Sequence, residues 1–179
     1  RASEACLDGG IAYRTPFISG KDSLSNQFST EDGRTIRVPP TLLISGMGIV
    51  PEDTKSMTMD LKRSGSVMIL VGSSTDHLGG SHYLRVGGDS SVGQDLLPVT
   101  DLTRGPATAH AVHAVITQGM ARSAHDLSEG GLLVAAAEMA FAGGLGIDID
   151  LAKMPVDGDV SITARAFAED PSRYLLEVD

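Results

Sequence analysis

The fold is decided by residues 124–141, whose sequence is AHDLSEGGLLVAAAEMAF. We expect a strand to end at His125-Asp126 and a helix to run from about Ser128 to Phe141. The apolar residues of this helix recur at helical spacing and form one broad stripe, made of Leu132, Val134, Ala135, Ala136 and Met139. A strand that leads directly into a helix predicts an α/β (α+β) domain, and the free amides at the helix N-terminus favour anions.

Apolar patterns on both sides of this stretch predict the remaining elements. Strands are expected at 11–18, 35–38, 41–50, 67–71, 145–151 and 174–178, and helices at 2–9 and 107–118. Asp32-Gly33 predicts a hairpin turn, and Gly9-Gly10 is expected to stop the first helix. Residues 72–100 are rich in Gly, Ser and Asp, which predicts a long irregular stretch.

Two features concern the organisation of the chain. Pro51-Glu52-Asp53 breaks the apolar pattern, so we place a domain boundary near residue 54, which gives domains 1–54 and 55–179. The sequence starts at Arg1 in what has the character of a helix interior, and no element follows the last expected strand. We therefore expect a piece of a longer chain.

The composition is that of an ordinary globular protein. Hydrophobic residues make up 41% of the 179 residues, and the 21 glycines point to tight turns. The formal charge of -9 repels a phosphate backbone, so nucleic acid is not an expected partner, and an anionic small substrate needs Mg²⁺ or a local cluster of donors. The single cysteine, Cys6, excludes an internal disulfide, and no apolar run approaches the ~18 residues of a membrane span. We expect a soluble, cytoplasmic chain without a membrane partner.

A polar loop, Ser19-Gly20-Lys21-Asp22-Ser23-Leu24-Ser25-Asn26, follows the apolar run Pro16-Phe17-Ile18. Its residue types are those that hold a metal-bound phosphate: a glycine for close approach of amides, a cation, a carboxylate for Mg²⁺ and hydroxyl donors. The loop is not a Walker A motif, because Thr15 and Asp22 stand where that motif has Gly and Ser or Thr. A strand-to-loop turn with a surface Lys–Asp pair is the alternative.

A second polar group lies in the fold-deciding stretch itself. Asp126 and Glu129 have the spacing of a capping box, with Asp in place of Ser or Thr. His125 is either a hydrogen-bonded core residue or a base or metal ligand, and the core interpretation is favoured.

Two further groups lie outside that stretch. His77 and His82 flank a Gly-Gly-Ser turn, which fits an anion-binding nest better than a zinc site. Arg173, before the last strand, either grips a phosphate or carboxylate or pairs with Glu169, and the pair is favoured without further context.

Four strings in register resemble a known family. They are Pro16-Phe17-Ile18-Ser19-Gly20-Lys21-Asp22-Ser23-Leu24, Val38-Pro39-Pro40-Thr41-Leu42-Leu43-Ile44-Ser45, Leu78-Gly79-Gly80-Ser81 and Ala124-His125-Asp126-Leu127-Ser128-Glu129-Gly130-Gly131-Leu132. Their order and spacing are similar to those of phosphoribosylformylglycinamidine synthase, a member of the aminoimidazole ribonucleotide synthetase-like superfamily. The resemblance covers nearly all of the chain.

The resemblance implies a fold and a reaction. Residues 1–54 look like the end of an N-terminal-type domain in the second half of that enzyme, and 55–179 like most of the following C-terminal-type domain, with a mixed sheet and packed helices. The family converts formylglycinamide ribonucleotide, ATP and glutamine-derived ammonia to formylglycinamidine ribonucleotide, ADP and phosphate in purine synthesis. Such phosphoryl transfer depends on Mg²⁺ and positioning.

The resemblance also implies roles for single residues. The nucleotide-binding positions correspond to Gly20 and Lys21, and the Mg²⁺ ligands to Asp22 and Asp126. The substrate-binding positions correspond to Ser23, Ser172 and Arg173. This chain has Gly-Lys-Asp-Ser where many relatives have Gly-Asn-Val-Ser, and a lysine at position 21 cannot ligate Mg²⁺.

Partners and alternatives follow from the same resemblance. The implied partners are the remaining domains of the enzyme, a glutaminase domain or subunit that supplies ammonia, and a small nucleotide substrate. The family's catalytic histidine lies in the first half, so no catalytic residue is assigned here and the fragment alone is expected to be inactive. A non-catalytic nucleotide-binding and subunit-contact module is the alternative, and a selenophosphate or thiamine phosphate kinase is a weaker one.

Overall fold

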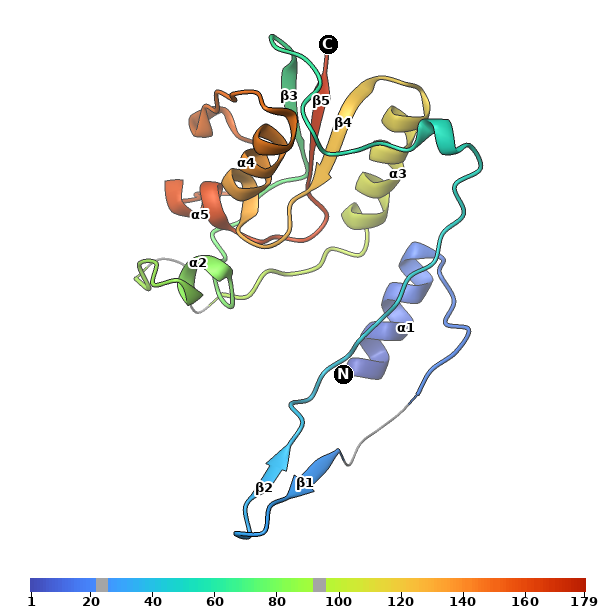
Figure 1. Ribbon diagram of the computed structural model, residues 1–179, viewed down its shortest axis with the longest axis vertical. Helices are drawn as coiled ribbons and strands as arrows, with labels where there is room; N and C mark the ends of the chain where they lie inside the picture. The colour runs from blue at the N-terminus through green and yellow to red at the C-terminus, as the bar shows by residue number, and fades with distance from the viewer. Residues whose placement is uncertain (22–25, 92–95) are drawn as a thin grey trace. The chain divides into compact units, whose positions relative to one another are not determined.

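The computed structural model describes residues 1–21, 26–91 and 96–179, and it divides into two compact units (Figure 1). The first unit comprises Arg1–Pro51 and the second comprises Glu52–Asp179. Each unit is described by itself. Among the described residues, no helix has both the length and the apolar character needed to cross a membrane.

A three-stranded antiparallel sheet forms the centre of the second unit. Its strands are β3 (Val67–Val71), β4 (Ala121–Asp126) and β5 (Tyr174–Val178), in the spatial order β3-β5-β4. The central strand β5 is buried on both faces, since Leu175 and Leu176 point to opposite faces and are 3% and 2% exposed. The expected strands at 67–71 and 174–178, and the strand end at Asp126, are confirmed.

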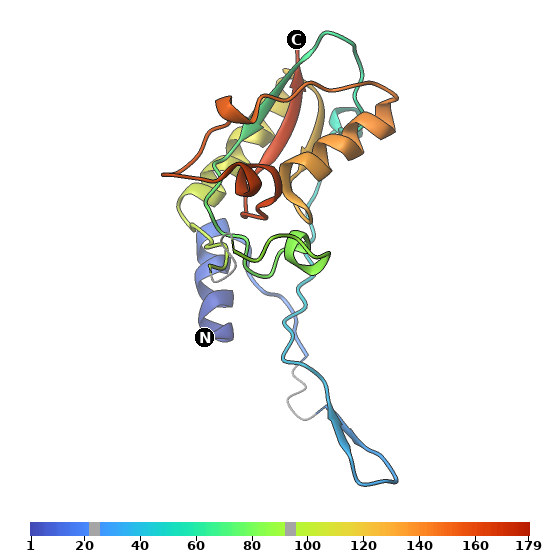
Figure 2. The ribbon, with the colours of Figure 1, turned by 90° about the vertical axis from the view of Figure 1, so that its left-hand side faces the viewer.

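Helices cover both faces of this sheet (Figures 1 and 2). Helix α4 (Gly131–Gly143) lies on one face and α3 (Arg104–Thr117) on the other, so the two helices predicted around these positions are confirmed. The main core lies between the sheet and α4 and contains Leu61, Leu127, Leu132, Ala135, Ala136, Met139, Met154 and Leu175. Met139 is completely buried, as its place in the apolar stripe requires.

The segment before β3 closes one end of this core. A Cβ atom added to Gly143 would lie 2.4 Å from the Leu61 carbonyl oxygen, so only glycine allows the end of α4 to approach this backbone. The buried carboxylate of Glu177 accepts hydrogen bonds from the backbone N–H groups of Lys62 at 2.8 Å and Arg63 at 2.9 Å. The Ser123 hydroxyl donates a third bond at 3.0 Å. These donors join β4 and β5 to the segment that precedes β3.

Short helices complete the second unit. They are η1 (Asp53–Lys55), α2 (His82–Arg85), η2 (Leu151–Lys153) and α5 (Ile162–Phe167). A smaller core of Leu78, Val160, Ala164 and Ala168 joins α5 to the loop before α2. The rings of Tyr83 and Phe167 stack over it with their centroids 5.1 Å apart. Apart from α2, residues 72–91 and 96–100 are irregular, as predicted for this region.

The first unit contains one helix and one hairpin. Helix α1 (Ala2–Tyr13) ends where Arg14 adopts a left-handed conformation with φ 55°, and the Thr15 N–H donates to the Gly10 carbonyl. Strands β1 (Gln27–Ser29) and β2 (Thr35–Arg37) form the hairpin predicted around Asp32-Gly33. None of the described residues of this unit is buried.

Four predictions about secondary structure are wrong: the helix stop at Gly9-Gly10 and the strands at 11–18, 41–50 and 145–151. Helix α1 continues through Gly9-Gly10, because a helical glycine costs only about 1 kcal/mol and the chain reverses at Arg14 instead. The expected strands at 11–18 and 41–50 are absent from the described residues, and the residues of the second run are exposed. Residues 145–150 alternate as expected and Leu145, Ile147 and Ile149 pack on the main core, yet no strand pairs with them. These apolar segments form no strand, because the described residues supply no neighbouring strand to accept and donate their backbone hydrogen bonds.

Candidate functional site

Polar residues gather at one end of the three-stranded sheet. Strands β3 and β4 end there, and the antiparallel β5 begins there. Three segments therefore meet: residues 72–76 after β3, 126–131 between β4 and α4, and 168–173 before β5. The Leu127 N–H donates to the Arg173 carbonyl at 3.0 Å, which ties the last two segments together.

The turn between β4 and α4 carries the predicted metal ligand, Asp126. The Ser128 hydroxyl donates to Oδ2 of Asp126, whose side chain is 61% exposed. This hydrogen bond lowers the pKa of Asp126 below its usual value, and burial opposes it only in part. The predicted capping box is wrong, because the N-cap of α4 is Gly130, with φ 83° and no side-chain cap.

Glu169 takes the place that the capping box was expected to fill. Its Oε1 atom accepts hydrogen bonds from the N–H groups of Gly130 at 2.7 Å and His82 at 2.8 Å. The His82 Nδ1 atom lies 3.3 Å from the same oxygen. One carboxylate therefore joins the starts of α2 and α4. The sequence offered no signal for it, because its partners lie 87 and 39 residues away.

Arg173 is buried and bonded to neighbours other than Glu169, so the favoured pair with Glu169 is not formed. Its side chain is among the largest that are fully buried, and Nη1 donates to the Ser74 hydroxyl at 2.6 Å. The other donors reach the carbonyl groups of Asp170, at 3.2 Å, and Ala168. Burial lowers the pKa of the guanidinium below its usual value, while the nearby carboxylates of Asp170 and Glu169 oppose this. These contacts hold the loop before β5 against the loop after β3.

Ser172 lines a small polar cavity of about 90 Å³ beside this buried arginine. Its φ of 59° is unusual for a residue other than glycine. The close approach of Gly72 makes this corner tight, because a Cβ atom there would lie 2.8 Å from the Ser172 carbonyl oxygen. The other lining residues are Ser73, Thr75, Val99, Asp101, Arg104, Gly105, Thr108, Asp157, Asp170 and Pro171.

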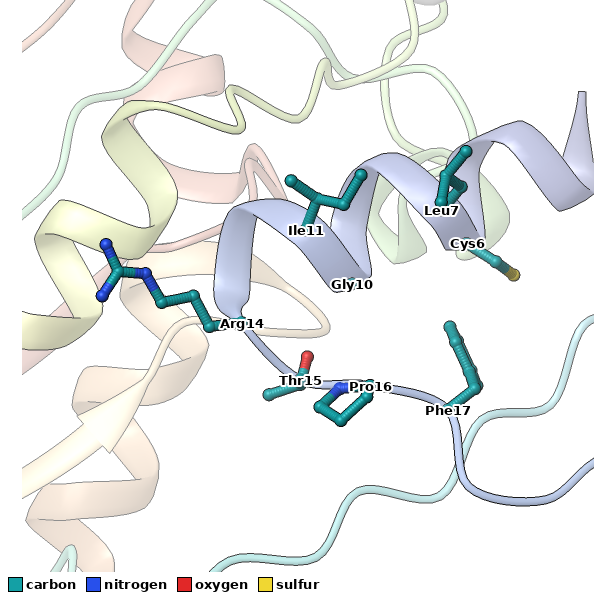
Figure 3. A pocket seen from close by; sticks show the side chains of 8 residues that line it. All are labelled: Cys6, Leu7, Gly10, Ile11, Arg14, Thr15, Pro16 and Phe17. Carbon is teal, nitrogen blue, oxygen red and sulfur yellow. The ribbon is translucent and has the colours of Figure 1, made fainter.

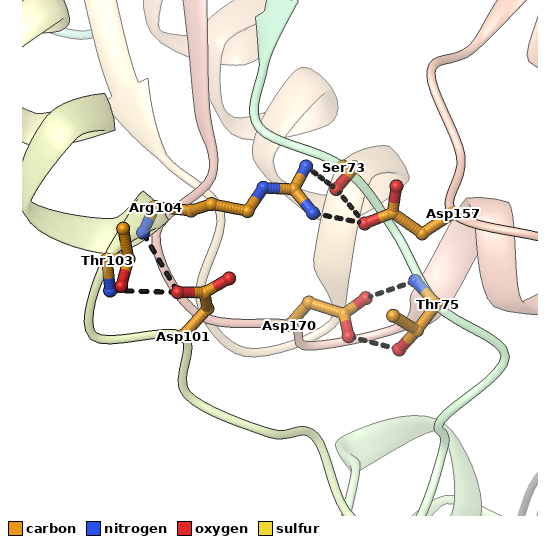
Figure 4. Close-up of polar contacts among 7 residues, drawn as sticks. All are labelled: Ser73, Thr75, Asp101, Thr103, Arg104, Asp157 and Asp170. Atoms are coloured by element: carbon orange, nitrogen blue, oxygen red, sulfur yellow. Dashed lines mark hydrogen bonds and ion pairs between the residues drawn. The ribbon is translucent and has the colours of Figure 1, made fainter.

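Internal hydrogen bonds engage the charged groups of this cavity (Figure 4). Arg104 donates to Asp157 at 2.6 Å and to the Ser73 hydroxyl at 2.7 Å. Asp170 accepts from the N–H and the hydroxyl of Thr75 at 3.1 and 2.5 Å. The Asp101 side chain caps the start of α3, accepting from the N–H groups of residues 103 and 104 at 2.8 and 2.9 Å.

His125 lies behind Asp126 at the end of β4. Its Nε2 atom is 2.8 Å from Oε2 of Glu138, and its Nδ1 atom is 3.3 Å from Oδ1 of Asp126. The side chain is 18% exposed, which agrees with the favoured interpretation of a hydrogen-bonded histidine. Glu138 was not predicted. A usable signal was present, since it is the sole charged residue of α4, whose residues are all described.

The polar loop of the first unit, residues 19–26, is described only in part. Gly20 and Lys21 are exposed and outside regular structure, and the predicted residues Asp22 and Ser23 lie outside the described residues. Just before this loop, a hollow of about 360 Å³ opens between α1 and the segment that follows it (Figure 3). Its lining is mostly apolar and consists of Cys6, Leu7, Gly10, Ile11, Arg14, Thr15, Pro16 and Phe17.

The described residues contain no cluster of three or more histidine, cysteine or carboxylate side chains arranged to hold a metal ion. Asp126 and Ser128 nevertheless offer a carboxylate and a hydroxyl beside the start of α4. Mg²⁺ prefers oxygen ligands and is commonly held by one or two carboxylates together with substrate phosphates. The chemistry of these donors therefore fits a phosphate-bound Mg²⁺.

Comparison with known proteins gives matches over most of the chain. The family described as AIR synthase related protein, C-terminal domain, matches residues 63–179. The phosphoribosylformylglycinamidine synthase subunit PurL of Zymomonas mobilis is 37% identical over 174 residues, which are 97% of this chain and 22% of that protein. The same subunit of Rhodopseudomonas palustris strain HaA2 is 40% identical over 176 residues, or 98% of this chain and 22% of that protein. The chain thus spans about a fifth of the length of these curated relatives.

Solved structures show the same fold. Thermotoga maritima PurL complexed with FGAR matches with a TM-score of 0.69 at 19% identity, covering 98% of this chain and 28% of that one. The same protein complexed with ATP matches with a TM-score of 0.55 at 20% identity, covering 71% and 19%. These likenesses confirm the predicted α/β fold class, and the curated relatives confirm the resemblance seen in the sequence. Because the family match covers residues 63–179, the chain belongs to the AIR synthase related protein family.

Proposed function

We propose that this chain is part of an ATP-dependent C–N ligase of purine synthesis. The enzyme converts formylglycinamide ribonucleotide, ATP and glutamine-derived ammonia to formylglycinamidine ribonucleotide, ADP and phosphate. The observation that carries the proposal is the 37–40% identity to PurL subunits over 97–98% of the chain. Because the match extends through both structural units, it supports a shared role for the whole chain rather than for one unit.

In the first unit, the proposed nucleotide contacts are Gly20 and Lys21, and the proposed metal ligand is Asp22. In the second unit, the proposed metal ligand is Asp126. When bound, Mg²⁺ neutralises charge on the phosphates during phosphoryl transfer. The exposed carboxylate oxygens of Asp126 support its assignment, since Mg²⁺ prefers oxygen ligands.

The proposed substrate-binding residues are Ser23 in the first unit and, in the second unit, Ser172 and Arg173. The position of Ser172 in the lining of a polar cavity supports contact with a small ligand. The guanidinium of Arg173 is buried and bonded within the protein, so its contribution is to hold the loop that carries Ser172.

The proposed partners are the remaining domains of the same enzyme and a glutaminase domain or subunit that supplies ammonia. We place the enzyme in the cytoplasm and assign no catalytic residue to this chain. The isolated chain is therefore expected to form no ADP from formylglycinamide ribonucleotide, ATP and ammonia. Detectable ammonia-dependent ADP formation would contradict this assignment.

A chimera tests the proposed function directly. The aligned segment of Zymomonas mobilis PurL is replaced by this chain, and the chimera is expressed in bacteria that lack their own enzyme. We expect growth without added purines, and ADP formation that depends on formylglycinamide ribonucleotide in the purified chimera. A folded, soluble chimera without either activity would overturn the proposal, and the unmodified Zymomonas mobilis subunit serves as the positive control.

The same chimera separates a catalytic site from a silent structural one. Asp22→Asn is expected to abolish turnover while the protein remains folded, if Asp22 holds the reacting metal–nucleotide. Loss of thermal stability with turnover retained would instead favour the non-catalytic nucleotide-binding module.

A further inference from the structure

The imidazole of His125 connects the exposed carboxylate of Asp126 to helix α4. One ring nitrogen, Nε2, is 2.8 Å from Oε2 of Glu138, and the other, Nδ1, is 3.3 Å from Oδ1 of Asp126. His125 belongs to β4, and Glu138 lies on the helix that packs against that strand. A chain of three side chains thus runs from the helix, through the strand, to the turn.

Each oxygen of Asp126 consequently faces a different neighbour. Oδ2 accepts from the Ser128 hydroxyl, and Oδ1 faces His125. An aspartate that is 61% exposed is free to change rotamer unless its neighbours restrain it. His125 provides that restraint, because it is only 18% exposed and its far nitrogen is held by Glu138.

Neither His125 nor Glu138 has a role in the proposed function so far. The sequence pattern singled out His125 and favoured a hydrogen-bonded core residue over a functional one. His125 can support metal binding without touching the metal, because it contacts Asp126 on one side and Glu138 on the other. Residues behind a metal ligand orient that ligand and commonly change metal affinity 10–100-fold.

We infer that Glu138 and His125 are positioning residues, which fix the carboxylate of Asp126 in the orientation that binds a divalent cation beside the start of α4. The inference rests on the proposed function, in which Asp126 is a ligand of Mg²⁺. Glu138 fixes the imidazole, the imidazole fixes Oδ1, and Ser128 fixes Oδ2. The donors are thereby arranged before the metal–nucleotide binds.

The test measures metal binding rather than turnover. Mn²⁺ serves as the probe, and its binding to the complete synthase subunit in the presence of ADP is followed by electron paramagnetic resonance. Asp126→Asn identifies the site, because it is expected to remove one bound Mn²⁺. At that site, Glu138→Ala is expected to raise the Kd of Mn²⁺ by about 10–100-fold.

Two further variants separate positioning from general stability. Glu138→Gln places an amide at this position, and the amide can accept from or donate to Nε2 in either tautomer of the imidazole. This variant is therefore expected to keep most of the Mn²⁺ affinity of the unmodified protein. Glu129→Ala removes an exposed carboxylate from the same turn and is expected to leave the Kd unchanged, although it alters the local charge equally. Melting temperatures without metal show whether Glu138→Ala weakens the fold itself.

The outcomes of this experiment are distinct. If Asp126→Asn leaves the number of bound Mn²⁺ ions unchanged, the metal role of Asp126 in the proposed function fails, and the inference fails with it. If Asp126→Asn removes the ion but Glu138→Ala binds it as tightly as the unmodified protein, only the inference is overturned. Equal losses for Glu138→Ala and Glu129→Ala would also overturn it, because the effect would then be one of charge alone.

Discussion

The two structural units contain similar apolar sequences but bury them very differently. In the second unit, Met139 is completely buried between α4 and the sheet, whereas Met47 in the first unit is 93% exposed. Helix α4 buries five of its residues and α1 buries none. Apolar content alone therefore does not create a core. The second unit has one because three strands and two helices within it supply each other's neighbours.

The largest loss of stability is expected on substitution of Arg173, which joins two loops of the second unit. Arg173→Met removes the donors of the Ala168 and Asp170 carbonyl groups and of the Ser74 hydroxyl. We expect the free energy of unfolding of this unit to fall by about 3–5 kcal/mol, since each buried acceptor without a donor costs about 1–3 kcal/mol. Urea unfolding followed by circular dichroism measures the change.

A matched substitution shows whether the charge or the geometry of Arg173 matters. Arg173→Lys keeps the charge but is expected to recover only part of the stability, because a single ammonium cannot replace the fork of the guanidinium. Unchanged stability in Arg173→Met would show that these contacts are dispensable. It would also favour the hypothesis that Arg173 serves substrate instead.

The two methionines test the comparison of the units most directly. Met139→Ala is expected to lower the free energy of unfolding by about 2–5 kcal/mol, because it leaves a cavity in the main core. Met47→Ala is expected to change it by less than about 0.5 kcal/mol in the same chain. Thermal and urea unfolding of both variants give the two values. Equal losses would show that the first unit buries residue 47 after all.

The presence or absence of a neighbouring strand also decides which elements the sequence could predict. The strands at 67–71 and 174–178 and helix α4 formed where their periodicity placed them, because their partners lie within the chain. The run at 41–50 has an equally apolar pattern, but the described residues of its unit supply no paired strand. Periodicity predicts which face of an element is apolar, but it does not predict which other element packs against that face.

The candidate site was predictable where its residues stand next to the ends of strands. Asp126, Ser172 and Arg173 stand next to strand ends, and strand ends of one sheet meet in space, so their approximate positions could be inferred. Glu169 and Glu138 could not be assigned in this way. Glu169 reaches amides 87 and 39 residues away, and no local motif encodes which amide a carboxylate will reach. Glu138 stands out as the sole charged residue of α4, but that signal does not say which imidazole it meets.

Glu177 is expected to make the stability of the second unit depend on pH. Burial alone would raise its pKa, but the N–H groups of Lys62 and Arg63 and the Ser123 hydroxyl hold it below the ordinary value of 4.5. The ionised form therefore stabilises the fold above pH 4.5, and this contribution is lost as the pH falls through the lower, folded-state pKa. Glu177→Gln is expected to cost about 1.5–3 kcal/mol near neutral pH, and the gap to the unmodified chain should close in acid.

Urea unfolding of both proteins across this pH range measures that gap. Glu31→Gln, at an exposed carboxylate of the first unit, is the control and should leave stability unchanged at each pH. A gap that widens on acidification would contradict the assigned direction of the Glu177 pKa.

The smallest effects are expected for two exposed ion pairs, one taken from each unit. Arg104 reaches Asp157, 53 residues away, and Ser73, 31 residues away, whereas Arg34 pairs with Asp32 within one turn. Arg104→Gln should lower the urea midpoint slightly, because the bonded side chain connects segments that separate on unfolding. Arg34→Gln should leave it unchanged, since that pair can persist in the unfolded chain. The Arg104 effect should shrink as salt is added, because exposed charges are screened, and an effect of equal size at both positions would show that connecting distant segments adds nothing.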